Sequence, residues 1–132
     1  MNVLFLCVGN SGRSLLAERL FARAAGGHHE ARSAGSAPGA APHPHVVTAL
    51  REVGIDAAGH VPRKLDEELL AWANIAVSTY SEEVCPVTPG VRRISWVFAD
   101  PKGLPLDDVR AIRHEIDRAV RELVVDLDAQ TV

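Results

Sequence analysis

The sequence predicts an α/β fold, in which a small doubly wound sheet of four parallel strands carries helices on both faces. Three observations support this prediction. Short apolar stretches of strand length alternate along the chain with segments of helical periodicity. The first apolar stretch is continuous, as in a parallel strand that is covered on both faces. The chain has 132 residues, 47% of them hydrophobic and 23% charged, which suits a single domain spanning residues 1–132.

The N-terminal segment is expected to form a strand, a loop and a helix. Residues 2–8 are β-branched and aliphatic, and they predict the first strand. Residues 9–12, Gly-Asn-Ser-Gly, interrupt the apolar stretch. A helix is expected from Arg13 onward, because apolar residues then recur three and four positions apart. Gly26 and Gly27 end this helix.

The same alternation continues to the end of the chain. Further strands are expected at 30–34, 75–79 and 91–95, and short helices at 46–53 and 66–72. The longest helix begins at Asp107, because apolar residues are spaced by three or four from there to Leu127. Residues 35–42 are rich in Gly and Pro, which predicts a loop rather than a domain linker. Strands separated by helices in this way form right-handed βαβ units.

The composition argues against several classes of protein. The net charge is −3, from 14 basic and 17 acidic residues, and no block of like charge favours nucleic acid or a membrane surface as a partner. The longest clean apolar run, residues 3–8, is far too short to cross a bilayer and lacks the flanks of a signal peptide. A cytoplasmic protein is therefore expected. Two cysteines argue against a disulfide framework and leave reactive or buried thiols as alternatives.

The turn between the first strand and the first helix is the predicted ligand site, because open α/β sheets bind ligands at the carboxyl ends of their strands. This turn reads Cys-Val-Gly-Asn-Ser-Gly-Arg-Ser from Cys7. Its residues are small, so several backbone N–H groups can converge at the positive end of the helix. A tetrahedral oxyanion is the expected ligand. The predicted oxyanion-binding residues are Val8, Gly9, Asn10, Ser11, Gly12 and Arg13.

Four side chains of this turn have predicted roles. The helix N-terminus and Arg13 favour the thiolate of Cys7, which makes Cys7 a nucleophile at neutral pH. Arg13 is placed to donate two N–H groups to two oxygens of the ion. We expect the Ser14 hydroxyl to donate to the sulfur and Asn10 to hold a left-handed backbone conformation. The alternative is that Cys7 is a buried thiol at a strand end, beside a glycine turn.

These motifs resemble those of a known family. The run Val-Leu-Phe-Leu-Cys at 3–7, followed by Gly-Asn-Ser and Arg-Ser, is similar to the phosphate loop of the low-molecular-weight protein tyrosine phosphatases and of the arsenate reductases that share their fold. The ending Ile-Arg-His-Glu-Ile at 112–116 resembles the reductase branch more than the phosphatase branch. Other matching motifs follow in the family's order over nearly the whole chain: Ser33-Ala34-Gly35, His43-Pro44, Cys85-Pro86, Trp96 and Asp100-Pro101. The resemblance implies the low-molecular-weight phosphatase fold and an enzyme.

The resemblance also implies that Asp100 is the general acid that protonates the departing oxygen. The residues themselves allow this role, because a carboxyl on a loop before the last helix, followed by Pro101 and Gly103, could approach the oxyanion from the side opposite the sulfur. The alternative is that Asp100 only begins a turn, since Asp-Pro is a common turn dipeptide.

A second thiol distinguishes the two branches. A phosphatase needs only water, whereas an arsenate reductase needs a thiol that carries two electrons away. By its Cys-Pro context, Cys85 resembles the last redox cysteine of the thioredoxin-coupled reductases. Their additional cysteine is absent, because Tyr80, Ser81 and Glu82 occupy that region. Either Cys85 resolves the intermediate, or mycothiol, glutathione or a thioredoxin system does so. The alternative for Cys85 is a packed, inert thiol.

Arsenate reductase is the favoured interpretation, with arsenate as the small oxyanion substrate. Phosphomonoester hydrolysis by a protein tyrosine phosphatase is the alternative. Leu15 and Lys102 stand where the phosphatase branch usually has proline and tyrosine, and residues 36–39 lack its aromatic wall residue. A non-catalytic oxyanion-binding module is a third possibility, which the combination of a nucleophile and an acid disfavours.

Neither a metal ion nor a tightly bound cofactor is expected. Basic Arg63 stands near the position of an acidic ligand in relatives that bind potassium. The histidines His28, His29, His43 and His45 lack the spacing of a metal site and are expected to be solvated loop residues.

Overall fold

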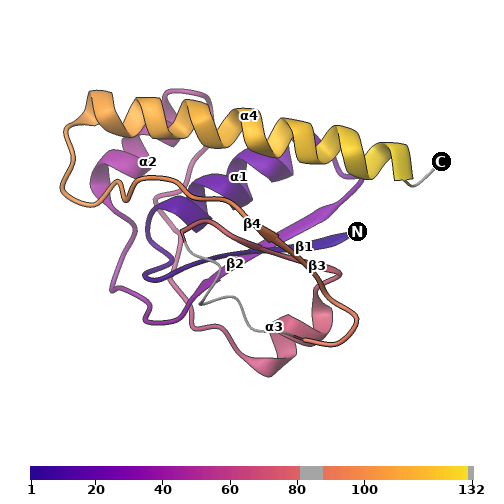
Figure 1. The fold of residues 1–132 in the computed structure, drawn as a ribbon. Helices are drawn as coiled ribbons and strands as arrows, with labels where there is room; N and C mark the ends of the chain where they lie inside the picture. Colours follow the sequence, from indigo (N-terminus) through magenta and orange to yellow (C-terminus); the bar gives the residue numbers. More distant parts are fainter. Residues whose placement is uncertain (81–87, 131–132) are drawn as a thin grey trace.

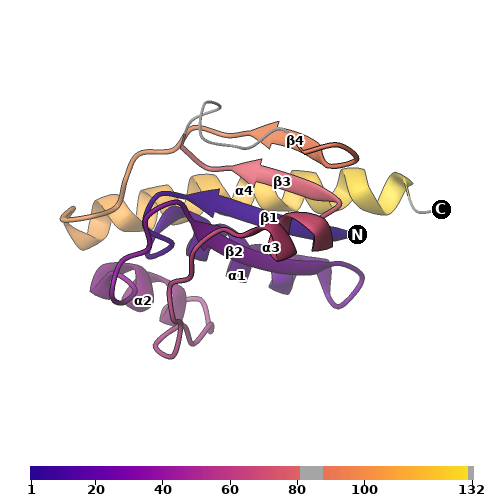
Figure 2. The same cartoon turned by 90° about the horizontal axis from the view of Figure 1, so that it is seen from below.

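The computed structural model describes residues 1–80 and 88–130. Its centre is one sheet of four parallel strands in the order β2-β1-β3-β4 (Figures 1 and 2). The strands are β1 (Asn2–Cys7), β2 (Glu30–Gly35), β3 (Ile75–Ser78) and β4 (Arg92–Ser95). The predicted four-stranded parallel sheet is thus confirmed, and β1 lies in its interior, between β2 and β3.

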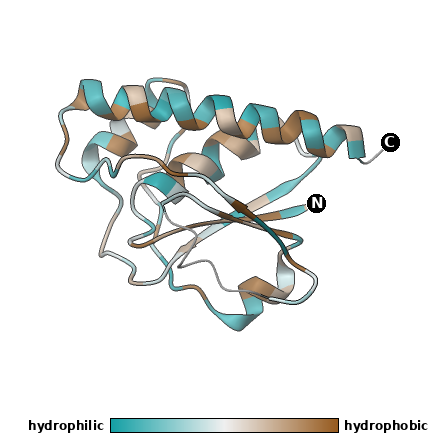
Figure 3. Ribbon diagram, in the orientation of Figure 1, coloured by the Kyte–Doolittle hydropathy of each residue, from teal (hydrophilic) through white to brown (hydrophobic). Residues whose placement is uncertain are grey.

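Helices cover both faces of this sheet, as the alternation of elements predicts. They are α1 (Arg13–Ala25), α2 (Pro44–Arg51), α3 (Glu67–Trp72) and α4 (Leu106–Gln130). Figure 1 shows α1, α2 and α4 on one side of the sheet and α3 on the other. Hydrophobic and hydrophilic residues alternate along α4 in Figure 3, as its spacing predicts. No helix in the described ranges is both long and apolar enough to cross a membrane.

Strand β1 contributes to two cores because its residues alternate in direction. Val3 and Phe5 pack into the larger core beneath α1, α2 and α4. Leu4 and Leu6 pack into the smaller core on the side of α3. All four side chains are buried, which explains why the apolar run is continuous rather than alternating.

The helix boundaries are set by residues with particular backbone preferences. α1 ends at Gly26, which has the left-handed conformation expected of a C-terminal glycine (φ 58°). α2 begins at Pro44, two residues before the predicted start, because proline fits the first turn of a helix, where its missing N–H is not needed. These boundaries place the β1–α1 loop and the loop before α2 at the same end of the sheet (Figure 1).

The prediction of a solvated loop histidine is wrong for His29. Its side chain is buried beside Phe21, because residue 29 lies where the entry to β2 meets the end of α4. Its Nε2 lies 2.7 Å from Asp128 Oδ1, and its Nδ1 lies 3.3 Å from the N-terminal amine. His28 and His45 are exposed, as predicted, whereas His43 is partly buried.

Candidate active site

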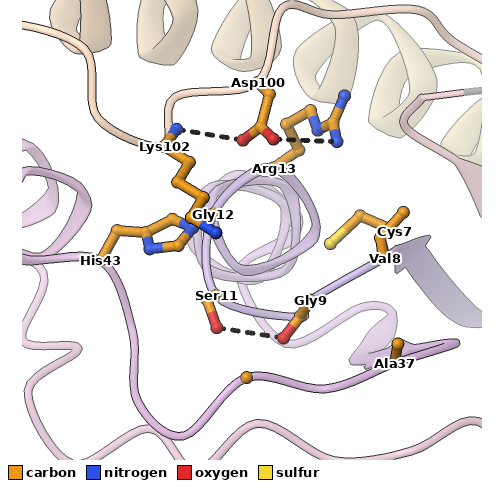
Figure 4. Close-up of a pocket in the computed structure, with 11 residues that line it drawn as sticks. Cys7, Val8, Gly9, Ser11, Gly12, Arg13, Ala37, His43, Asp100 and Lys102 are labelled. Atoms are coloured by element: carbon orange, nitrogen blue, oxygen red, sulfur yellow. Dashed lines mark hydrogen bonds and ion pairs between the residues drawn. The ribbon is translucent and has the colours of Figure 1, made fainter.

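The β1–α1 loop, residues 8–12, surrounds a cavity of about 220 Å³ at the carboxyl end of β1. Cys7 is the last residue of β1, and its side chain is buried at the base of the cavity. The cavity is lined by Cys7, Val8, Gly9, Ser11, Gly12, Arg13, Ala37, Gly39, His43, Asp100 and Lys102 (Figure 4). It therefore collects most of the predicted oxyanion-binding residues and the predicted acid in one place.

The backbone of this loop is oriented by hydrogen bonds on its outer side. Every carbonyl from Cys7 to Gly12 accepts a hydrogen bond from elsewhere in the fold. The donors are the backbone N–H groups of Ser36, Ala37, Gly39, His43 and Leu16, and the Nε2 of His60. In a trans peptide unit the C=O and N–H groups point in opposite directions, so the N–H groups that follow these carbonyls face the cavity. They form a cup that suits an anion.

Asn10 stabilises the shape of the cup through both its backbone and its side chain. Its φ of 50° is left-handed, as predicted, and its side chain is fully buried. Its Oδ1 accepts the backbone N–H of Arg63 at 3.0 Å, and its Nδ2 donates to Ser14 Oγ at 2.9 Å. Its own backbone N–H points to the Cys7 sulfur at 3.2 Å.

The Cys7 sulfur has hydrogen-bond donors on two sides. Ser14 Oγ lies 2.9 Å from Sγ, the contact that the sequence predicts. Because Ser14 Oγ already accepts from Asn10, its hydroxyl hydrogen is available to the sulfur. With the Asn10 N–H, this gives the sulfur two hydrogen-bond donors.

Arg13 connects the cup to the loop of residues 96–105, which carries Asp100. Its Nη1 donates to the carbonyl of Phe98 at 3.2 Å, and its Nη2 lies 3.8 Å from Asp100 Oδ2. The Asp100 side chain is 55% exposed, and its Oδ1 accepts the backbone N–H of Lys102 at 3.0 Å. Asp100 thus begins a turn and also lines the cavity.

Two glycines let the surrounding segments approach the cup closely. A Cβ on Gly35 would stand 2.3 Å from the carbonyl oxygen of Val8, and a Cβ on Gly12 would stand 2.7 Å from Cγ of Pro101. Gly35 on β2 pairs with Cys7 on β1. Gly12 lies next to Pro101 of the 96–105 loop. The sequence did not predict this role of Gly35, although its position at the end of a predicted strand offers a signal.

His60 and Arg63 support Asn10 from the loop between α2 and α3, a role that the sequence did not predict for either residue. No local motif marks them, because their contacts cross about fifty positions of the chain.

His43 lies at the mouth of the cavity rather than in free solvent. Burial lowers the pKa of His43 below its ordinary value; Asp100 opposes this shift, and Lys102 adds to it.

The second thiol named by the sequence analysis is Cys85. Cys85 lies in the range 81–87, outside the described residues. Within the described part of the chain, no three His, Cys, Asp or Glu side chains are grouped to hold a metal ion.

Comparisons with known proteins give the chain a family. Residues 2–132 match the family described as low molecular weight phosphotyrosine protein phosphatase. The chain is 35% identical over 124 residues to an arsenate reductase of Brevibacillus brevis, covering 91% of each protein. It is 33% identical over 122 residues to arsenate reductase 2 of Staphylococcus epidermidis, covering 89% of this chain and 92% of that protein.

Solved structures give the same result. A thioredoxin-dependent arsenate reductase of Corynebacterium glutamicum superposes with a TM-score of 0.85 at 32% identity, over 98% of this chain but only 62% of that one. An arginine phosphatase from Geobacillus stearothermophilus superposes with a TM-score of 0.85 at 27% identity, over 98% and 94% of the two chains. These relatives are all enzymes, as the resemblance implies. The chain therefore belongs to the low molecular weight phosphotyrosine protein phosphatase family and is an enzyme of that fold.

Proposed function

We propose that this enzyme reduces arsenate to arsenite with Cys7 as its nucleophile. The observation that carries the proposal is the size and lining of the cavity. At about 220 Å³ it is smaller than the roughly 300–1,000 Å³ of typical organic ligand sites. None of the described residues that line it is Phe, Tyr or Trp, and the small residues Ala37 and Gly39 are among them. Such a cavity suits a small inorganic oxyanion better than a phenyl ring, and arsenate reductases among the relatives support the same substrate.

In the first step, the Cys7 thiolate attacks arsenic while the cup holds the oxygens. The backbone N–H groups of the cup and the Arg13 guanidinium would stabilise the charge that spreads over these oxygens. Asp100 would donate a proton to the oxygen opposite the sulfur. A sulfur–arsenic bond forms, an arsenic–oxygen bond breaks, and water leaves with arsenic still in the +5 state.

In the second step, another thiolate attacks the sulfur of Cys7. A disulfide forms, the sulfur–arsenic bond breaks, and its electron pair stays with arsenic, which leaves as arsenite. The two sulfurs together lose the two electrons that arsenic gains. The attacking thiol is Cys85 or an external thiol from mycothiol, glutathione or a thioredoxin system; a thioredoxin-dependent relative supports the last of these.

The test measures arsenite formation with thioredoxin, mycothiol and glutathione systems supplied in turn. Cys7→Ser is expected to abolish turnover with every reductant. Cys85→Ser separates the two sources of the second thiol: arsenite formation with a small thiol survives this change only if the external thiol resolves the intermediate directly. Efficient hydrolysis of a phosphotyrosine peptide, with no arsenite under any reductant, would overturn the proposal. Tight arsenate binding without any turnover would instead support a non-catalytic binding module.

The role of Asp100 needs its own experiment. We expect Asp100→Asn to slow the step in which oxygen leaves and to change oxyanion affinity little, because the side chain is half exposed and lies 3.8 Å from Arg13. Turnover that is unchanged at every pH would remove Asp100 as the acid.

One observation favours phosphomonoester hydrolysis as a second candidate function. The Tyr80 ring lies beside Arg13, with its centroid 5.5 Å from the guanidinium carbon, so an aromatic side chain is near the site. In this case Cys7 would form a phosphocysteine that water hydrolyses. An arginine phosphatase among the structural relatives supports phosphoryl transfer on this fold.

A further inference from the structure

The mouth of the cavity has basic side chains on one side. Lys102 lies in the 96–105 loop, and His43 directly precedes α2. Both side chains line the same cavity as Cys7. Figure 4 shows the Lys102 side chain running from that loop toward the ring of His43. The two side chains are therefore neighbours on the rim above the cup.

The positive charge of Lys102 is available to a ligand. Asp100 is the nearby carboxylate, but its Oδ2 faces Arg13 and its Oδ1 accepts the backbone N–H of Lys102 rather than its ammonium. Over residues 1–80 and 88–130, no ion pair involves the Lys102 ammonium. His43 is partly buried, and this burial lowers its pKa. The rim thus provides one positive charge and one imidazole ring that can form hydrogen bonds.

The position of this rim decides which part of a substrate it meets. In a phosphomonoester held in the cup, the ester oxygen lies opposite the Cys7 sulfur, on the side of Asp100, and the group attached to it extends toward the mouth. There it meets the lining residues of the mouth, among them Lys102 and His43. These residues provide a positive charge and hydrogen bonds, so a carboxylate or second phosphate gains more there than an apolar group.

We propose that Lys102 and His43 form a second anion subsite, and that this enzyme hydrolyses small phosphomonoesters whose leaving group carries a carboxylate or a second phosphate. The sulfur–phosphorus bond forms as the phosphorus–oxygen bond breaks, with Asp100 supplying the proton to the alcohol. Water then attacks phosphorus, Asp100 takes up its proton, and the Cys7 thiolate leaves with release of phosphate. The inference rests on Cys7 as the proposed nucleophile but not on arsenate reduction.

The binding test compares two phosphonates of the same length, 3-phosphonopropionate and propylphosphonate, by titration calorimetry on the full chain. Both present the same phosphonate to the cup, and only the first carries a carboxylate. We expect the wild type to bind 3-phosphonopropionate roughly two- to five-fold more tightly, as for a partly exposed charge contact. Lys102→Gln should bring this ratio close to one. Raising the salt concentration should also lower the ratio.

Lys64→Gln is the matched control, because Lys64 is the other lysine of the chain and does not line the cavity. The wild-type ratio should persist in this variant. A matched pair of esters, phosphoglycolate and ethyl phosphate, tests the substrate class, and kcat/KM from phosphate release should favour phosphoglycolate in the wild type but not in Lys102→Gln.

The outcomes separate this inference from the proposed function. Equal phosphonate affinities in the wild type, or a ratio that Lys102→Gln leaves unchanged, would overturn the second subsite alone. Arsenite formation without hydrolysis of either ester would overturn the substrate class and leave the reductase intact. Failure of both phosphonates to bind would overturn both the oxyanion-binding role of the cup and the second subsite.

Discussion

We expect Gly35→Ala, which adds only one methyl group, to displace the backbone of the cup. A Cβ at position 35 would stand 2.3 Å from the carbonyl oxygen of Val8, 2.9 Å from the Asn10 nitrogen and 3.0 Å from the carbonyl carbon of Val8. All three are backbone atoms, so no side chain can turn aside. Real Cβ atoms essentially never approach closer than 3.0 Å, which means that the loop must move by at least 0.7 Å.

This displacement falls on the atoms that bind the oxyanion. The Val8 carbonyl accepts a hydrogen bond from Ala37, so moving it disturbs the contact that turns the following N–H toward the cavity. A misplacement of about 1 Å near reacting groups costs on the order of 10²-fold in rate. Overpacking of this kind also costs about 1–3 kcal/mol of folding free energy. We therefore expect a folded variant whose kcat/KM is lower by roughly 10²-fold.

The assay combines turnover, oxyanion binding by calorimetry and urea unfolding for the wild type and two alanine variants. Gly59→Ala is the control, because a Cβ at Gly59 meets nothing within 4 Å and its φ is not in the left-handed region. The control should match the wild type in all three measurements. A Gly35→Ala variant with wild-type kcat/KM and wild-type oxyanion affinity would refute the argument that this contact shapes the cup.

Three further predictions concern the supports of the cup and of α4. Ser14→Ala should slow alkylation of Cys7 by iodoacetamide at neutral pH by roughly ten- to hundred-fold, because a hydrogen bond to a charged group contributes about 1.5–3 kcal/mol; an unchanged rate would remove Ser14 as a donor. Asn10→Ala should be about 1 kcal/mol less stable in urea than Asn10→Gly, because both lose the side-chain contacts but only alanine resists the φ of 50°; equal stability would contradict this. The hydrogen bond from Arg110, followed by that from Arg113, lowers the pKa of Glu52 from 4.5 to about 2, so its stabilising charge is fully present above pH 4.5 and lost as the pH falls through about 2. The Tm difference between the wild type and Glu52→Gln should therefore shrink over this window in calorimetry, and a constant difference would contradict the assignment.

The elements of the fold could be predicted because their signals are local. The continuous run of β1 and the spacing of apolar residues in α4 each specify an element and its buried surface. The same holds for the loop backbone: small residues before a helix predict an anion cup, and Asn10 has the left-handed conformation that its side chain favours.

The features that the sequence did not predict depend on contacts between distant segments. His29 is buried where it contacts Asp128 at the end of α4 and the N-terminal amine. No local sequence pattern predicts either contact. His60 and Arg63 support Asn10 from a loop whose residues show no periodicity. Lys102 could be recognised as unusual from the sequence, but its position beside His43 became visible only in the folded chain.

The most direct test of the account is a crystal structure with bound vanadate, which forms a bond to a thiolate sulfur. We predict vanadium bonded to Cys7 Sγ, its oxygens bound by the backbone N–H groups of residues 8–13, and the Arg13 guanidinium donating to two of them. Vanadate bound elsewhere with the cup empty, or a Cys7 sulfur turned away from the cavity, would contradict the central claim that this loop presents a nucleophile to a tetrahedral oxyanion.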